Sequence, residues 1–169
     1  MKYVGGSSQA RIQSEVANHI VSFVHQFEPE AEEVHRKNGI DVRSISGIVY
    51  CRTTHSVRST GSRRFIHRAD LQCDVVAEKL NDSGITASPF YARMPEAQKS
   101  RALVDWKDGK ISCIVATIAF GMGIDHPHVR YVVHADMPKS FEGYYQETGR
   151  CGRDGHRSRC VLFYCTSER

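Results

Sequence analysis

Five short apolar segments are spread along the chain, and most of them are continuous rather than alternating with polar residues. They are "GIVYC" at 47–51, "ITASPFYA" at 85–92, "ISCIVAT" at 111–117, "VRYVVHAD" at 129–136 and "RCVLFYC" at 159–165. A continuous apolar run of this length is typical of a strand that is buried on both faces of a sheet. The pattern therefore predicts five strands in the interior of the protein.

Between these segments the apolar positions follow the helical period. Residues 73–84 place Val76 and Leu80 one turn apart, and residues 95–109 begin with proline and end with glycine. Residues 140–149 begin with a serine that is suited to an N-cap. Strands that alternate with helices at this spacing predict an α/β protein with a mostly parallel central sheet and helices on both faces. In such sheets, ligands bind beyond the carboxyl ends of the strands.

The N-terminal part of the chain differs from the rest because it contains no strand pattern. The segment "SEVANHIVSFVHQF" at 14–27 carries apolar residues at helical spacing, and residues 28–46 are mostly polar. We therefore expect a helix and a polar connection over residues 1–46, followed by one domain over residues 47–169.

The composition narrows the class of protein. The chain has 169 residues, enough for one domain with its own core, and its 40% hydrophobic and 25% charged content is typical of globular proteins. The net charge of +4 permits a nucleic-acid or phosphate partner without requiring one. No segment is apolar enough to span a bilayer or serve as a secretory signal, so we expect no membrane partner and no secretion. The six cysteines form no C-x-x-C pair, which predicts no metal site and a reducing location.

Two glycine-containing segments carry the candidate chemistry. "ATIAFGMGID" at 116–125 leaves a predicted strand directly. It can let backbone N–H groups approach a phosphate, or it can be a tight turn that merely needs glycine. "QETGRCGRDG" at 146–155 places Arg150 and Arg153 on flexible backbone. An isolated cluster of this kind is usually a solvated basic turn, whereas arginines that reach an anion would use their planar fork to bind phosphate.

Together and in this order, three segments resemble motifs IV, V and VI of the RecQ family of ATP-dependent DNA helicases. They are "YCRT", "ATIAFGMGIDHPHVRYVVHADMPKS" and "EGYYQETGRCGRDG", and the resemblance runs from about Gly47 to Cys165. It implies a RecA-like fold, which is a three-layer sandwich of the P-loop NTPase type around a mostly parallel sheet. It also implies 3′-to-5′ DNA unwinding driven by ATP, in DNA repair and recombination. The last motif differs from its usual form in DEAD-box RNA helicases.

The resemblance assigns roles on the nucleotide side. Arg150 and Arg153 would face the ATP phosphates, and at least one of them would be the catalytic arginine finger. Gln146, Gly123 and Asp125 would lie beside the nucleotide. The implied cofactor is ATP with Mg²⁺, bound mainly by a first RecA-like lobe, because this sequence contains no G-x-x-x-x-G-K-[ST] segment. We therefore expect no ATP hydrolysis by this chain alone.

The resemblance also assigns Arg52, Thr117 and Lys139 to the DNA backbone, although Lys139 taken alone is equally well a solvated lysine. The implied partners are DNA, as a single strand and a duplex junction, and the first RecA-like lobe of the same protein. The expected location is the nucleus in a eukaryote and otherwise the cytoplasm. Two other functions stay open at this point: a stand-alone nucleic-acid-binding or regulatory module without motor activity, and a lobe of an RNA helicase.

The sequence departs from the family pattern in three places. "FYARM" stands where the family tends to have "YHAG", and Cys151 stands where it usually has alanine, which adds an oxidisable thiol. Residues 57–72 interrupt motif IV and its following helix with four arginines. This insertion is a loop that contacts DNA, a solvated loop, or a short intron translated by mistake. The intron, which fits best, predicts that the segment has no regular structure.

Overall fold

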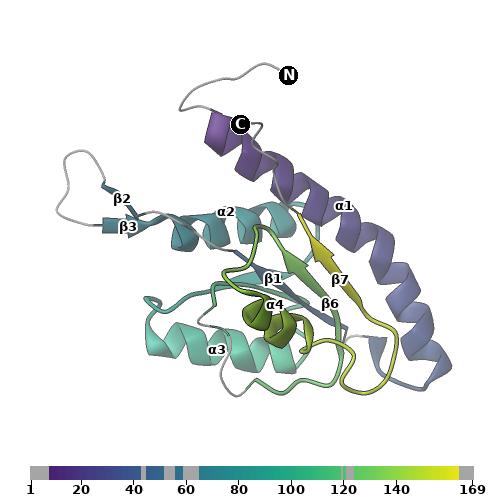
Figure 1. Cartoon of the computed structure of the whole chain (residues 1–169). Helices are drawn as coiled ribbons and strands as arrows, with labels where there is room; N and C mark the ends of the chain where they lie inside the picture. Colours follow the sequence, from purple (N-terminus) through teal and green to yellow (C-terminus); the bar gives the residue numbers. More distant parts are fainter. Residues whose placement is uncertain are drawn as a thin grey trace.

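A central sheet of five strands organises the protein (Figure 1). The computed structural model describes residues 8–42, 45–51, 56–58, 65–118, 120 and 124–163. In chain order, its elements are α1 (Ser8–Lys37), β1 (Ser46–Tyr50), β2 (Ser56–Arg58), β3 (Phe65–His67), α2 (Arg68–Asp82), β4 (Ala87–Phe90), α3 (Glu96–Lys107), β5 (Cys113–Ala116), β6 (Val129–His134), α4 (Phe141–Thr148) and β7 (Arg159–Leu162). The five predicted strands correspond to β1, β4, β5, β6 and β7, and the three helices predicted between them to α2, α3 and α4.

The sheet has the strand order β4-β5-β1-β6-β7, and all four neighbouring pairs are parallel. This arrangement confirms the predicted parallel sheet. In the central strand β1, Gly47 lies between Cys113 of β5 and Tyr131 of β6. A Cβ atom at position 47 would lie 1.9 Å from the ring of Tyr131, so only glycine fits there.

Both faces of the sheet are covered, which gives the three layers. Successive strand residues point to opposite faces, and β1 shows both directions. Val49 belongs to a core cluster with Ile20 of α1 and Leu80 of α2. Its neighbour Ile48 belongs to a second cluster with Trp106 of α3. The continuous apolar runs of β1, β5 and β6 therefore reflect burial on two sides, as expected, whereas the edge strands β4 and β7 are only partly buried.

The helix α1 is longer than the sequence predicts. It runs on to Lys37 through residues that we expected to form a polar connection, and it contains Pro29. The reason is that the buried stripe continues past the proline, with Ala31 and His35 following Phe27 at helical spacing. Burial of this face offsets the backbone hydrogen bond that the proline removes. Although α1 has 30 residues, neither it nor another helix in the described part of the chain is long and apolar enough to cross a membrane.

The inserted segment 57–72 also has more structure than the intron hypothesis predicts. Its described residues include an antiparallel pair of short strands, β2 and β3, and the first turns of α2. At its end, the buried Gln72 donates a hydrogen bond to the Asp136 carboxylate at 2.9 Å. The expectation of no regular structure is therefore wrong for residues 65–72, because this stretch starts a helix that packs on the sheet. Residues 59–64 lie outside the described part.

Candidate functional site

Two arginines that follow α4 converge on the segment that precedes β6. We call residues 149–158 the arginine turn. Arg150 Nη1 donates to the Ile124 carbonyl at 3.5 Å, and Arg153 Nη1 donates to the same carbonyl at 3.3 Å. Arg153 Nη1 also pairs with Asp125 Oδ1 at 2.6 Å. The structure thus brings together three residues that the family resemblance assigns to the nucleotide side, although Asp125 lies 25 or more positions before the two arginines.

The two arginines differ in exposure and in partner. The side chains of Arg153 and Asp125 are 37% and 81% exposed. Their ion pair is therefore solvated, contributes little stability and can be exchanged for another anion. Arg150 is half-buried beside Tyr50. Burial raises the pKa of the Tyr50 hydroxyl, and the positive charge of Arg150 opposes that rise. Arg153 is consequently the more accessible cation of the two.

A buried ion pair anchors the arginine turn to β6. The side chain of Arg130 is 0% exposed, and its guanidinium bonds to the carboxylate of Asp154 and to backbone carbonyls. Asp154 also accepts from the backbone N–H of His156 at 3.1 Å and lies 3.1 Å from His128 Nδ1. Burial alone would raise the pKa of Asp154, but its bonds to Arg130, His156 and His128 hold that pKa well below its usual range. Asp154 is therefore ionised, and it fixes the backbone next to Arg153.

Gly152 closes the turn against the same strand. Its φ angle is +68°, in the left-handed region, and its N–H donates to the Val129 carbonyl at 3.0 Å. A Cβ atom there would lie 2.6 Å from Ser158 Oγ. Both the backbone conformation and the close contact favour glycine between the two arginines.

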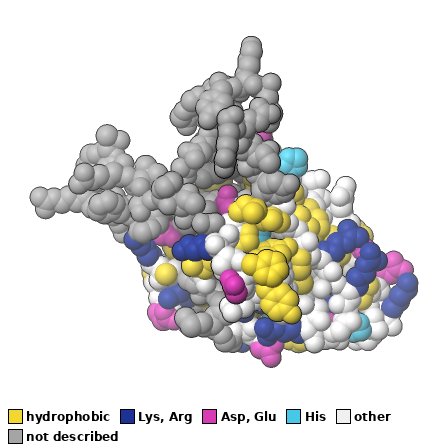
Figure 2. Space-filling model, viewed as in Figure 1, with side chains coloured by type: hydrophobic (Ala, Val, Ile, Leu, Met, Phe, Trp, Pro, Cys, Tyr) yellow, Lys and Arg dark blue, Asp and Glu magenta, His cyan; other side chains and the backbone are white. Residues whose placement is uncertain are grey.

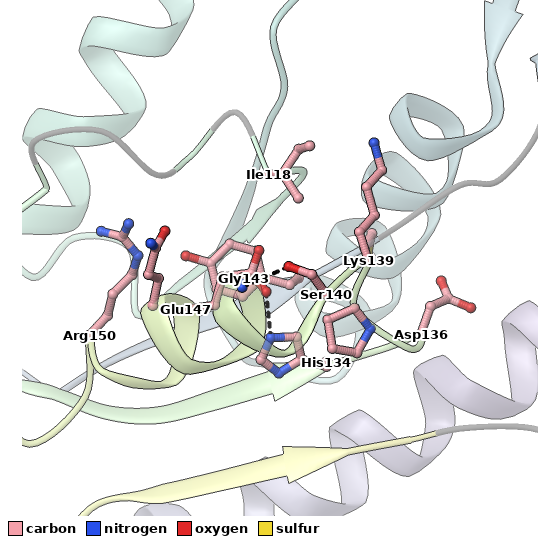
Figure 3. A pocket seen from close by; sticks show the side chains of 12 residues that line it. Ile118, His134, Asp136, Lys139, Ser140, Gly143, Glu147 and Arg150 are labelled. Atoms are coloured by element: carbon pink, nitrogen blue, oxygen red, sulfur yellow. Dashed lines mark hydrogen bonds and ion pairs between the residues drawn. The ribbon is translucent and has the colours of Figure 1, made fainter.

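A pocket of about 320 Å³ lies along α4 (Figure 3). Lys139 and Ser140 line it near the start of the helix, and Gln146 and Arg150 line it near the helix end. The helix itself begins with an N-cap, since Ser140 Oγ accepts from the Gly143 N–H at 3.1 Å. One pocket thus extends from Lys139, which we predicted to contact DNA, to Gln146 and Arg150, which we predicted to lie beside the nucleotide.

The floor of this pocket holds α4 on the sheet. His134, at the end of β6, lies 2.8 Å from Glu147 (Nε2–Oε2), and its side chain is 2% exposed. The His134 ring stacks on Tyr50 of β1 with centroids 5.3 Å apart and contacts Tyr144 of α4 at 5.0 Å. Figure 3 shows Glu147 and His134 joined below the pocket. These contacts connect the ends of two central strands to the helix that carries Gln146.

The remaining predicted residues fall into three groups. Gln146 and Lys139 are exposed and line the pocket. Thr117 follows β5 directly and is half-buried; its backbone N–H donates to the Phe90 carbonyl at 3.2 Å. It does not line the pocket, although its neighbour Ile118 does. Gly123 and Arg52 lie outside the described residues.

Sequence reasoning missed four residues that organise the site: Arg130, Asp154, His134 and Glu147. One signal was present for Arg130, because a charged residue inside a strand predicted to be buried requires a partner. The identity of that partner could not be predicted, since Asp154 is 24 positions away.

Comparisons with known proteins agree with this fold. The helicase conserved C-terminal domain family matches residues 46–155. The chain is 43% identical over 133 residues to the putative ATP-dependent DNA helicase Q1 of Caenorhabditis elegans, which covers 79% of this chain and 18% of that protein. It is 42% identical over 119 residues to the ATP-dependent DNA helicase RecQ of Haemophilus influenzae, which covers 70% of this chain and 17% of that protein.

Among solved structures, the E. coli DEAD-box protein SrmB, crystallised with RraA, matches with a TM-score of 0.65 at 21% identity over 90% of this chain and 72% of that one. At this identity the likeness establishes the RecA-like fold alone. The chain spans less than a fifth of the length of these two relatives. This protein therefore belongs to the helicase conserved C-terminal domain family, and over most of its length it is similar to RecQ-family DNA helicases.

Proposed function

We propose that this chain is the second motor lobe of an ATP-dependent DNA helicase that moves in the 3′-to-5′ direction. Its arginine turn completes an ATP site that is held mainly by a first lobe, and the start of α4 contacts a DNA strand. The observation that carries this proposal is the convergence of Arg150 and Arg153 on Ile124 at the surface of the lobe.

The residues of the arginine turn suit a triphosphate. Arg153 already holds an exposed carboxylate, Asp125, through one Nη. A phosphate oxygen can replace that carboxylate at little cost, because the pair is solvated, and it can accept the same planar fork. When bound, ATP with Mg²⁺ would supply the phosphoryl transfer. The contribution of this chain is to place positive charge where negative charge develops, with Asp154 and Gly152 fixing the backbone on either side of Arg153.

The other end of the pocket suits a DNA strand. Lys139 is exposed where the chain enters α4, and Ile118, next to Thr117, lines the same pocket. We assign Lys139 and Thr117, together with Arg52, to the sugar-phosphate backbone. Because α4 carries Gln146 and Arg150 at its other end, a DNA contact at its start and a nucleotide contact at its end would move as one body. This rigid connection would couple hydrolysis to stepping along the strand.

An apolar surface beside the pocket would receive the first lobe. Phe141 and Tyr145, one turn apart on α4, are 79% and 73% exposed, and Met137 and Ile118 are each 55% exposed. Figure 2 shows apolar side chains gathered on this face of the molecule. Exposed aromatic residues at this density are typical of protein contacts. Contact here would bring the first lobe next to Arg150.

The test of the nucleotide role joins this chain to a P-loop lobe from a RecQ-like relative and measures ATP hydrolysis stimulated by DNA. Arg153→Ala or Arg150→Ala should lower kcat by about 10³-fold or more if that arginine is the finger. Affinity for single-stranded DNA should stay unchanged. Arg36→Ala is the matched control, because Arg36 lies on α1 in an exposed pair with Glu32. Both arginine variants matching the control would refute the proposal.

The DNA role can be tested on the chain itself. Single-stranded DNA is titrated at several salt concentrations, and Lys139→Ala should reduce the salt dependence by about 0.7 in log–log slope, the value for one phosphate contact. RNA of the same sequence should bind or stimulate hydrolysis more weakly. The isolated chain should hydrolyse no ATP. If the joined protein also fails to do so while DNA binding persists, the stand-alone binding module becomes the better description.

A further inference from the structure

A thiol of the arginine turn meets a thiol of β7. Cys151 directly follows Arg150, and Cys160 lies in β7, where the chain leaves the turn. Their sulfur atoms are 3.2 Å apart. The backbone carbonyl of Thr148 lies 3.3 Å from Cys151 Sγ and 3.8 Å from Cys160 Sγ, so the same acceptor holds both side chains. The two cysteines are thus in contact across a turn that contains Arg153.

This pair is accessible, unlike the other cysteines that the structure describes. Cys160 is exposed and Cys151 is half-buried, whereas Cys51, Cys73 and Cys113 are buried. Small oxidants in solution can therefore reach Cys160 and its neighbour. The buried thiols provide a comparison within the same molecule, because Cys51 also contacts another cysteine, Cys73, but away from solvent.

The two thiols also divide the roles that disulfide chemistry requires. The hydrogen bond from Cys160 is the main cause that lowers the pKa of Cys151 to about 6. The same contact raises the pKa of Cys160. Near neutral pH, Cys151 is consequently the thiolate, which is the form that reacts, and Cys160 is a protonated neighbour in position to resolve the product.

We propose that Cys151 and Cys160 are a redox modification site that forms a reversible disulfide when hydrogen peroxide or a related peroxide is present. The Cys151 thiolate attacks one peroxide oxygen, the O–O bond breaks, and the departing hydroxide takes a proton to become water. The Cys160 sulfur then attacks the sulfur of the resulting sulfenic acid. The S–O bond breaks, and the proton of Cys160 leaves with hydroxide as a second water. Peroxide is reduced by two electrons, and the two thiols are oxidised to the disulfide.

Little movement separates the reduced pair from the disulfide. The sulfur atoms need to approach from 3.2 Å to the disulfide length of about 2.05 Å. The new bond would close a ring that contains Gly152, Arg153 and Asp154. The disulfide itself does not depend on the function proposed above. The effect of the disulfide on activity does rest on that function. A closed ring restrains Arg153, so the oxidised lobe should support ATP hydrolysis less well.

The test treats the folded chain with hydrogen peroxide, blocks the remaining thiols and maps disulfides by mass spectrometry after trypsin digestion. Because Cys160 and Cys165 fall in one tryptic peptide, the experiment uses a Cys165→Ser background. The expected product is residues 151–153 joined to residues 160–169, lighter by two hydrogens than the separate peptides and restored by dithiothreitol. The Cys51 and Cys73 peptides should remain reduced.

Two variants in the same background identify each role. In Cys160→Ser, oxidation of Cys151 should stop at the sulfenic acid, which dimedone traps. In Cys151→Ala, Cys160 should show no oxidation under conditions that convert the unmodified pair completely. The proposal is overturned if Cys151 is over-oxidised or trapped by dimedone while Cys160 is present, if the buried Cys51–Cys73 pair oxidises first, or if neither Cys151 nor Cys160 reacts. These readouts involve no nucleotide or DNA, so they are independent of the helicase assays.

Discussion

Replacing Asp154 by asparagine tests the anchor of the arginine turn. The substitution keeps the shape of the side chain but removes its charge, which leaves the Arg130 guanidinium buried with only carbonyl oxygens as partners. Arg130 is 0% exposed and Asp154 14% exposed, so the pair is almost completely shielded from water. Removing one partner of a buried ion pair typically costs about 3–5 kcal/mol. We expect the lower end, about 3 kcal/mol, because asparagine retains an oxygen acceptor.

The assay is urea unfolding at pH 7, supported by thermal unfolding. A loss of about 3 kcal/mol reduces the folded-to-unfolded ratio by about two orders of magnitude. It corresponds to a fall in Tm of about 6–12 °C for a chain of this size. Asp108→Asn is the matched control, since Asp108 pairs with Lys110 at the surface with 51% exposure. That variant should lose less than about 1 kcal/mol.

The pH dependence provides a second readout. The pKa of Asp154 is lowered in the folded state, so its charge stabilises the fold above its unfolded pKa of about 3.9. This contribution is lost as pH falls through the lowered folded value. The stability difference between the unmodified protein and Asp154→Asn should therefore shrink below about pH 4. Adding Arg130→Met to Asp154→Asn should recover part of the loss, because no buried charge remains. If Asp154→Asn is no less stable than Asp108→Asn, the anchoring argument is wrong.

Three further predictions follow from the same region and from the sheet. Gly152→Ala should destabilise by about 1–3 kcal/mol in urea unfolding, because alanine is strained at φ +68° and its Cβ would crowd Ser158; equal stability would contradict the geometry. Gly47→Ala should lower the unfolding free energy by more than Gly152→Ala and yield little soluble protein, since its Cβ would lie 1.9 Å from the Tyr131 ring; normal expression and an unchanged Tm would contradict this prediction. Alkylation of Cys151 by iodoacetamide should follow a midpoint near pH 6, and Cys160→Ala, which leaves no donor at position 160, should move that midpoint toward the ordinary value of 9.0; a midpoint that stays in place would remove Cys160 as the cause.

Much of the fold could be predicted because its signals are local. The five strands appear as apolar runs, most clearly in β1, β5 and β6, which are buried on two faces, and Ser140 caps α4 as its position indicates. The segments that contain Arg150, Arg153 and Asp125 could be identified as candidate site segments from their residues and their order along the chain. The continuation of α1 over residues 28–37 could not be predicted, because Pro29 and the charged residues around it favour a connection. Only packing against the sheet makes the helix continue.

The sequence by itself determined the elements, the parallel sheet and the family resemblance, because backbone preferences and two-sided burial leave a pattern within each segment. Only the tertiary structure decided which side chains meet. Arg130 pairs with Asp154, His134 pairs with Glu147, and Cys151 contacts Cys160. Each of these contacts depends on how α4 and the arginine turn return across β6, a path set by the packing of the whole lobe. The sequence around such a residue does not predict which distant residue it contacts.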